Sequence, residues 1–328
     1  MTLATDQLYI NIILIIVGLF LLLKGSNWFI DSATYIAKKF DVSDMVIGLT
    51  LVSIGTSLPE LGANVYASLS NQGEVALGNV VGSNITNITL ILGIGATLAG
   101  KLQIPKSLLT RDSIILVITY FLLIYISIFN FFTPTSTILR WEGFLLLFFF
   151  IIYVFMLFKS KDINEEEAES DEHFINTILK AIIFFIIGFL MITIGAKISV
   201  DSVVAIATTL NISKEIISGT IIAFGTSVPE LAVTVISIKK NKNNLALGNI
   251  VGSCIFNILL VMGVAVVIRP VNISLDMSTV FMPMMLFSGA LLAIFMRIGY
   301  QLARWEGIVL ISLYLAYIAY NMKQVLFS

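Results

Sequence analysis

Two glutamates within apolar sequence are the residues of this chain best suited to chemistry. Glu60 ends the motif Gly-Thr-Ser-Leu-Pro-Glu at 55–60, and Glu230 ends the motif Gly-Thr-Ser-Val-Pro-Glu at 225–230. A carboxylate inside a bilayer costs about 2.5–3.5 kcal/mol on insertion scales, so by default it marks an ion or substrate pathway. Because the motif occurs twice, we predict that both carboxylates serve one shared site.

Proline in each motif is expected to break a helix. Pro59 has no backbone N–H, so the Gly55 carbonyl loses its helical partner and carbonyl oxygens around residues 53 to 56 become available. Pro229 repeats the arrangement. Irregular backbone at membrane depth is tolerated only where it is buried in protein or lines a polar cavity. The motif hydroxyls add further oxygens: Thr56, Ser57, Thr226 and Ser227.

Composition places these motifs in a membrane protein. Of the 328 residues, 58% are hydrophobic and only 12% are charged, whereas soluble domains carry roughly a quarter charged residues. A formal net charge of −1 argues against nucleic-acid binding, which needs a basic surface. Cys254 and His173 are the single cysteine and histidine, too few for a zinc, copper or iron–sulfur site. A bound ion therefore meets oxygen ligands.

Ten apolar stretches are long enough to cross a hydrocarbon core of ~30 Å, which takes about 20 helical residues. They lie at about 9–30, 44–70, 75–99, 109–130, 141–158, 175–200, 215–238, 244–268, 278–297 and 303–322. An acidic segment with three consecutive glutamates separates the fifth from the sixth.

The two halves of the chain match at an offset of 170 residues. Ala76–Ser83 matches Ala246–Ser253, and Asn87 matches Asn257. Arg-Trp-Glu-Gly at 140–143 reappears at 304–307; Trp and Arg at helix ends are typical interface anchors. Each half holds five spans, an odd number, so the second half enters the membrane from the opposite side, as in the inverted repeats of transporters.

The predicted fold is therefore an all-α integral membrane protein with ten transmembrane helices in two inverted five-helix repeats. Residues 1–158 form the first repeat, 159–174 an acidic cytoplasmic linker and 175–328 the second repeat. With the N-terminus outside, 13 of the 19 lysines and arginines lie at cytoplasmic helix ends and five at outer ends. This positive-inside bias predicts a multi-pass plasma-membrane protein with both termini outside.

Helix rise places the polar side chains at one depth. Counted from the turn at 71–74, Glu60 lies ~16 Å into the membrane, while Ser83 and Asn87 lie ~14 and ~20 Å in. Ser253 and Asn257 reach the same level from the other side if the second half is inverted. We expect one oxygen-rich pocket near the midplane between four helices.

Two carboxylates among neutral oxygens suit a hard cation. Ca²⁺ takes six to eight oxygens in flexible geometry, whereas Mg²⁺ releases its waters reluctantly. A formal charge of −2 is balanced by one divalent ion or by several Na⁺ or H⁺. Such mutual exclusion is what an exchanger requires.

At these motifs the chain resembles the cation/calcium exchanger superfamily, and within it the sodium/calcium exchanger family of prokaryotic type. Residues 48–93 and 218–263 are similar to the family's two alpha repeats. The resemblance implies an antiporter, not an enzyme, that extrudes Ca²⁺ in exchange for Na⁺ by alternating access, without a cofactor or an obligate protein partner. It also implies that the first and sixth spans, with Gly25 and Gly195, slide across the core.

The resemblance implies a specific set of ion ligands. Glu60 and Glu230 would hold Ca²⁺. Hydroxyls would help to hold Na⁺, backbone carbonyls would join them, and two amides would line the same pocket. The hydroxyls belong to Thr56, Ser57, Ser83, Thr226, Ser227 and Ser253, the carbonyls to Ser53 and Ala223, and the amides to Asn87 and Asn257.

One departure from the family pattern bears on the counter-ion. Some prokaryotic relatives carry Asp where Asn257 stands, so the titratable charge here rests on Glu60 and Glu230. This argues against proton coupling and removes an acidic residue that K⁺-dependent relatives use. The alternatives that remain are a Ca²⁺/H⁺ or K⁺-assisted exchanger of the same superfamily, a passive cation channel and an intramembrane hydrolase with paired carboxylates.

Overall fold

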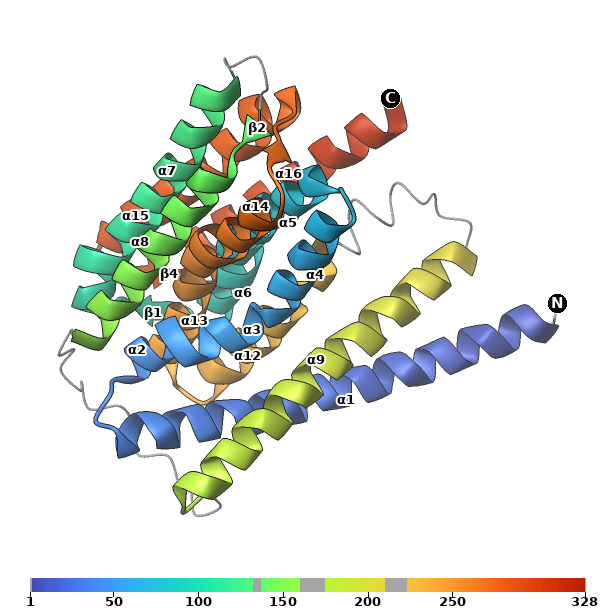
Figure 1. The fold of residues 1–328 in the computed structure, drawn as a ribbon. Helices are drawn as coiled ribbons and strands as arrows, with labels where there is room; N and C mark the ends of the chain where they lie inside the picture. Colours follow the sequence, from blue (N-terminus) through green and yellow to red (C-terminus); the bar gives the residue numbers. More distant parts are fainter. Residues whose placement is uncertain (1, 132–136, 160–174, 210–222, 328) are drawn as a thin grey trace.

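The computed structural model describes residues 2–131, 137–159, 175–209 and 223–327. Nearly all of these residues are helical, and they form a bundle with a two-helix arm beside it (Figure 1). All but Lys159 of the predicted acidic linker, including His173, lies outside the described residues.

Eight described helices are long and apolar enough to span a membrane. A ninth span consists of Asp44–Thr56 and Leu58–Leu69, which meet at a bend of 44°. The eight are Leu8–Lys39, Gly73–Ala99, Leu108–Ile128, Arg140–Leu157, Ile178–Thr209, Asn243–Ile268, Met277–Arg297 and Arg304–Lys323. The seventh predicted span, 215–238, begins outside the described residues, and only its part from residue 223 is described.

Both halves of the chain contribute elements to the bundle, and those of the first half come first in the chain. They are α2 (Asp44–Ile47), η1 (Gly48–Val52), α3 (Ser53–Thr56), α4 (Leu58–Leu69), α5 (Gly73–Thr86), η2 (Asn87–Ile91), α6 (Leu92–Ala99), η3 (Leu108–Asp112), α7 (Ser113–Phe131) and α8 (Arg140–Lys159). Those of the second half are α11 (Ala223–Gly225), α12 (Val228–Lys239), α13 (Asn243–Phe256), η5 (Asn257–Met262), α14 (Gly263–Ile268), η6 (Met277–Phe281), α15 (Met282–Arg297) and α16 (Arg304–Phe327).

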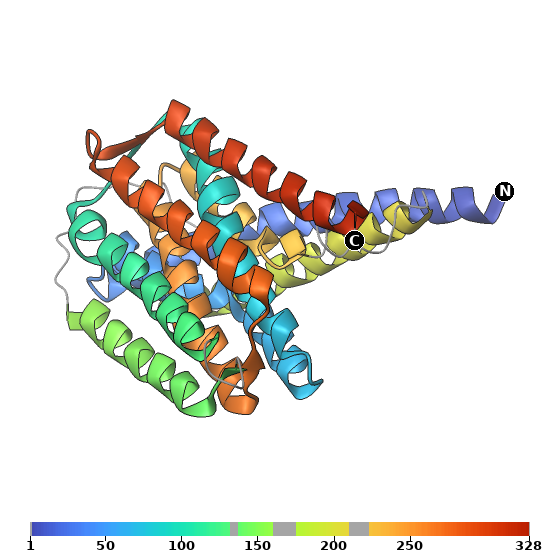
Figure 2. The ribbon, with the colours of Figure 1, turned by 90° about the horizontal axis from the view of Figure 1, so that it is seen from above.

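The arm consists of α1 (Thr2–Lys39) and α9 (Ile178–Thr209), which cross beside the bundle (Figures 1 and 2). Both helices extend beyond the apolar stretches predicted for them, because the polar residues at their ends continue the helix without a proline. Glycines let the two backbones touch. A Cβ on Gly25 would lie 2.9 Å from the Gly188 carbonyl oxygen, and one on Gly195 would lie 2.7 Å from that of Gly18.

Short strands join the two halves of the chain at their loops. They are β1 (Lys101–Gln103), β2 (Thr137–Ile138), β3 (Val271–Asn272) and β4 (Gln301–Ala303). The first pairs antiparallel with the last, as Leu102 faces Leu302, and the middle two pair with each other, as Ile138 faces Val271. Each ladder therefore takes one strand from each half.

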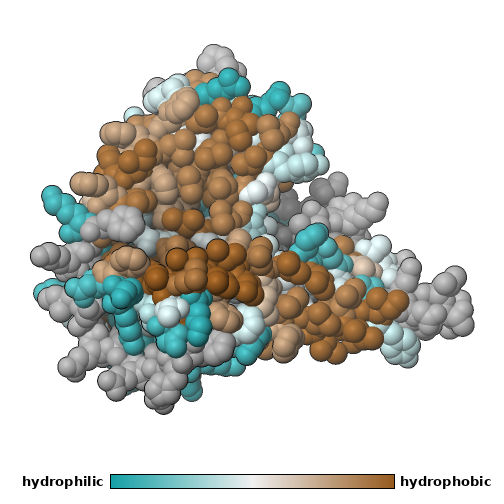
Figure 3. All heavy atoms as spheres, turned by 60° about the horizontal axis from the view of Figure 1, so that its bottom comes forward, coloured by the Kyte–Doolittle hydropathy of each residue, from teal (hydrophilic) through white to brown (hydrophobic). Residues whose placement is uncertain are grey.

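The most buried span is α13 with η5, of whose most apolar window 83% is buried. It packs directly on η1, where a Cβ on Gly48 would lie 2.7 Å from the Leu245 carbonyl oxygen and one on Gly248 would lie 2.6 Å from that of Met45. This close approach brings the first motif against the second half of the chain. Outer helices instead present apolar side chains, such as Phe148 on α8 at 57% exposure, and Figure 3 shows broad hydrophobic surface on the bundle and the arm.

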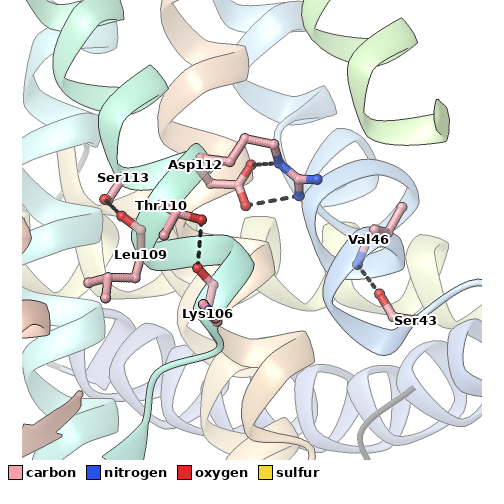
Figure 4. A network of polar contacts seen from close by, with 8 residues as sticks. Ser43, Val46, Lys106, Leu109, Thr110, Asp112 and Ser113 are labelled. Carbon is pink, nitrogen blue, oxygen red and sulfur yellow. Dashed lines mark hydrogen bonds and ion pairs between the residues drawn. The ribbon is translucent and has the colours of Figure 1, made fainter. Parts of the chain in front are cut away.

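Polar contacts at the start of α2 and around η3 involve no residue of either motif (Figure 4). The Ser43 hydroxyl accepts a hydrogen bond of 3.3 Å from the Val46 N–H and so caps α2. Buried Asp112 takes two hydrogen bonds of 2.9 and 3.0 Å from the Arg111 guanidinium. These contacts fix helix ends and involve no residue predicted for the ion site.

Candidate functional site

Both signature motifs break their helix at the serine. Ser57 has φ −89° and ψ 4°, and Ser227 has φ −90° and ψ 4°. The helix restarts one residue later, and its early proline lacks an N–H that would have no helical partner there. The matched backbone angles show that the motif dictates the local break and does so in both halves.

The two carboxylates lie in the first turn of the restarted helices, Glu60 in α4 and Glu230 in α12. Their side chains are 1% and 0% exposed. The partial positive charge at a helix N-terminus favours an anion at this position. Ser57, three residues before Glu60, lies 3.3 Å from Glu230 Oε1, and a cation between two neighbouring carboxylates would relieve their repulsion.

Side chains of the first motif reach the second half directly. The Ser57 hydroxyl donates to Glu230 Oε1 at 3.3 Å. Thr56 Oγ1 donates to Asn249 Oδ1 at 3.0 Å and lies 3.3 Å from Ser253 Oγ. Thr56 and Ser57 of the first half thus lie against Ser253 and Glu230 of the second.

The second motif reaches back to the first half in the matched way. Thr226 Oγ1 donates to Asn79 Oδ1 at 3.4 Å. Asn79 and Asn249 occupy equivalent positions in the repeat, and neither is among the site residues that the sequence predicted. Their signal was the conserved spacing of the two copies of Ala-Leu-Gly-Asn, in which the asparagine faces the same way as the serine four residues later.

Further contacts bring the segments that begin with the two asparagines against the helices that carry the carboxylates. The helix that carries Glu60 packs on η5, which begins at Asn257, and the helix that carries Glu230 packs on η2, which begins at Asn87. Both segments are π-helical, a local widening that is frequent at functional sites. The motif helices and π-helical segments thus converge from both halves.

Several buried polar atoms of these residues have no hydrogen-bond partner among the residues that the structure describes. They are both oxygens of Glu60, Oε2 of Glu230, the hydroxyls of Ser83 and Ser227, and both amide atoms of Asn87 and Asn257. Leaving a buried polar group unsatisfied costs about 1–3 kcal/mol. The oxygens among them are the ligand type that Na⁺ and Ca²⁺ take, so this group of side chains, hereafter the oxygen cluster, fits a hard cation.

The two residues predicted to supply carbonyl ligands, Ser53 and Ala223, differ in what the structure shows of them. The Ser53 carbonyl accepts the Ser57 N–H at 3.0 Å and Thr56 Oγ1 at 3.3 Å, so an ion bound there would share an oxygen already in use. Ala223 begins α11, which leads into the second motif. In the described part of the chain, no three residues of the types His, Cys, Asp and Glu gather at one place.

The repeated Arg-Trp-Glu-Gly motif braces the halves against each other. Glu142 Oε2 accepts the Leu139 N–H and Glu306 Oε2 accepts the Ala303 N–H, both at 2.7 Å, so each glutamate caps its own helix. The arginines bond carbonyls in the opposite half: Arg140 Nη2 to Ile268 O at 3.1 Å and Arg304 Nε to Thr97 O at 3.2 Å. Trp141 and Trp305 are 59% and 55% exposed, as interface anchors would be.

Comparison with known proteins identifies relatives along nearly the whole chain. The family model described as sodium/calcium exchanger protein matches residues 10–159 and 180–323. Sodium/calcium exchanger MaX1 of Methanosarcina acetivorans is 34% identical over 94% of this chain and 97% of its own. The uncharacterized membrane protein MJ0091 of Methanocaldococcus jannaschii is 34% identical over 93% and 95%. A solved structure of the sodium-calcium exchanger NCX_Mj, soaked with Na⁺, matches with a TM-score of 0.81 at 31% identity, over 95% of this chain and 99% of the other.

Proposed function

Because the chain belongs to the sodium/calcium exchanger family, we propose that it is a secondary antiporter that exchanges Na⁺ for Ca²⁺ and normally extrudes Ca²⁺. The single observation that carries this proposal is the oxygen cluster, in which two buried carboxylates come from opposite halves, one of them bonded across the halves by Ser57, and several polar atoms have no partner among the described residues. The ions are transported substrates, and no cofactor is proposed.

The charge of the two carboxylates explains why Ca²⁺ and Na⁺ would be bound in turn. Glu60 and Glu230 would hold one Ca²⁺ together, and the same two negative charges would be balanced by Na⁺ ions when Ca²⁺ leaves. Residues of both halves would serve as ligands, so neither half binds the ion alone. Hydroxyls and carbonyls complete the Na⁺ sites: those of Thr56, Ser57, Ser83, Thr226, Ser227 and Ser253, and the carbonyls of Ser53 and Ala223. Asn87 and Asn257 line the same space.

The contacts between elements support an inverted repeat of residues 1–158 and 175–328, with ten spans. Contacts recur when the halves are exchanged: α6 packs on α16 and α8 on α14, while α4 packs on α14 and α6 on α12. The two strand ladders exchange in the same way. Halves related in this manner can alternate between two arrangements around one site, which is alternating access.

The arm is the element proposed to move. It packs on the bundle at the motif glycines, since a Cβ on Gly55 would meet the Phe29 ring at 3.0 Å and one on Gly225 would meet Val200 at 2.9 Å. A sliding arm would therefore pass directly over both helix breaks. We place both termini outside the plasma membrane and residues 159–174 in the cytoplasm, on the positive-inside bias.

Ion-gradient assays in proteoliposomes test the function. Vesicles that hold the full-length protein and Na⁺, diluted into Na⁺-free medium with labelled Ca²⁺, are expected to take up Ca²⁺. A folded protein that gives no uptake contradicts the proposal. Uptake driven by a pH gradient with Na⁺ absent would identify proton coupling, a requirement for K⁺ would identify K⁺ assistance, and Ca²⁺ flux without any counter-ion would identify a channel.

A further inference from the structure

A polar cavity lies at one end of the bundle and is lined by no residue of either motif. It measures about 360 Å³ and is lined by Ser68 and Leu69 from the end of α4, Arg140 at the start of α8, and residues 268–270 at the end of α14. Its wall therefore combines two helices of the first half with one of the second. Nothing in the exchange of Na⁺ for Ca²⁺ uses it.

Two guanidinium groups share this cavity. Arg140 is held in place by its hydrogen bond to the Ile268 carbonyl, and Arg269 is exposed. Neither arginine has an ion pair within the described residues. Two cations at one cavity repel each other unless an anion lies between them.

The acidic groups nearby do not neutralise the pair. Glu142 is 2% exposed and its carboxylate accepts the Leu139 N–H. Glu74 lines a neighbouring cavity of about 510 Å³ that shares Arg269 and Pro270, and it is absent from the lining of the two-arginine cavity. Among the described residues, no acidic side chain lines the two-arginine cavity, so its lining carries a net positive charge and favours an anion.

A buried hydroxyl completes the lining. Ser68 is 0% exposed, and its Oγ has no hydrogen-bond partner within the described part of the chain. A hydroxyl buried without a partner costs free energy that an apolar side chain would not. At the matched position of the second half the residue is Ile238, and Ala99 stands at the position matched to Arg269. The second arginine and the hydroxyl are therefore features of one half only.

From this lining the geometry points to a binding site for a phosphate group, held by the guanidinium groups of Arg140 and Arg269 and the hydroxyl of Ser68. Arginine matches phosphate geometry with paired N–H donors. Trp141, exposed beside Arg140, places the cavity at the depth of lipid headgroups. An anionic phospholipid headgroup and free phosphate offer the same chemistry, and a bound group would tie α4, α8 and α14 together across the two halves.

Native mass spectrometry of the full-length protein in detergent tests this site. Phosphatidylglycerol is expected to bind at least fivefold more tightly than phosphatidylcholine. Arg269→Ala should remove that preference, whereas Arg297→Ala, the loss of an exposed arginine that bonds only its own helix, should keep it. Ser68→Ala should weaken phosphatidylglycerol binding about threefold without lowering the thermal unfolding midpoint measured in the absence of lipid.

Inorganic phosphate, added at rising concentration, distinguishes the two sources. Displacement of phosphatidylglycerol by phosphate supports recognition of the phosphate group itself, and retention of the lipid against phosphate supports a lipid headgroup site. Equal binding of the two lipids without any phosphate binding, or unchanged phosphatidylglycerol binding by Arg269→Ala, overturns the site. These readouts involve no ion transport, so they stand apart from the exchange activity.

Discussion

The two halves of this protein match in sequence and backbone but differ in their contacts. In the first motif, the Ser57 hydroxyl reaches Glu230 at 3.3 Å and Thr56 bonds Asn249 at 3.0 Å. In the second motif, the Ser227 hydroxyl has no partner among the described residues, and Thr226 reaches Asn79 at 3.4 Å. Within the described residues, the first motif is therefore more tightly bonded to the opposite half than the second.

The arm shows the same difference at larger scale. Asp31 on α1 forms an ion pair with Lys240 at the end of α12 and so links the arm to the bundle. Its counterpart Asp201 on α9 pairs instead with Lys197 of its own helix, at 2.8 Å. Ser70 stands at the position matched to Lys240, so the first half offers Asp201 no equivalent partner.

These differences teach that a duplicated sequence need not produce a symmetric structure. Under alternating access, two inverted halves hold different conformations at any moment, and exchanging them moves the opening to the other side. Ion pairs present in one half only, such as Asp31 with Lys240, would then favour one of the two arrangements by their own free energy.

The largest effect is expected from removing either of the two glutamates, which the two halves have in common. Glu60→Gln and Glu230→Gln should each reduce Na⁺-driven Ca²⁺ uptake more than 100-fold, because each leaves one negative charge against a divalent ion. Initial uptake rates in proteoliposomes measure this, with the exposed Glu74→Gln as the control for loss of one carboxylate. Substantial transport by either buried-site variant would show that the halves do not contribute equally.

A smaller effect is expected where the halves differ. Asp31→Asn breaks the partly buried contact between arm and bundle, worth about 1 kcal/mol, and should change the apparent Ca²⁺ affinity or the uptake rate by roughly fivefold. Asp201→Asn breaks an exposed pair within one helix and should change neither by more than about twofold, since such pairs contribute about 0.3–0.5 kcal/mol. Equal effects of both changes would remove the proposed role of the Asp31 contact.

The smallest expected effect lies within the oxygen cluster. With Na⁺ and Ca²⁺ withheld, Ser57→Ala should lower the free energy of unfolding by about 1 kcal/mol, because it removes a hydrogen bond to Glu230. Ser227→Ala should lower it by less, because that hydroxyl has no partner among the described residues. Thermal unfolding in detergent measures both, and a greater loss for Ser227→Ala would contradict the asymmetry of the two motifs.

Much of the site could be predicted because its signals are local. The proline fixes where each helix breaks, and the rise of a helix sets the depth of Ser83 against Glu60. The family relationship inferred from the two motifs is confirmed along nearly the whole chain. The ligand roles and the inverted ten-helix arrangement remain predictions, the latter because part of the seventh span is not described.

Other features depend on packing that no local pattern encodes. The π-helical segments that begin at Asn87 and Asn257 pack on helices of the opposite half, and the hydrogen bond of Asn79 comes from Thr226 of the opposite half. The Arg-Trp-Glu-Gly motif was predicted to anchor the protein at the interface, and its tryptophans are exposed accordingly. Its arginines, however, bond carbonyls of the opposite half, which sequence alone does not indicate.

Calcium binding to the purified protein, measured by isothermal titration calorimetry in Na⁺-free detergent, tests the central claim that both halves build one site. The native chain is expected to bind one Ca²⁺ at this site, and Glu60→Gln and Glu230→Gln should each abolish it, although each keeps the other motif intact. If the native chain bound two Ca²⁺ and each variant still bound one, the motifs would form two separate sites and the claim would be contradicted.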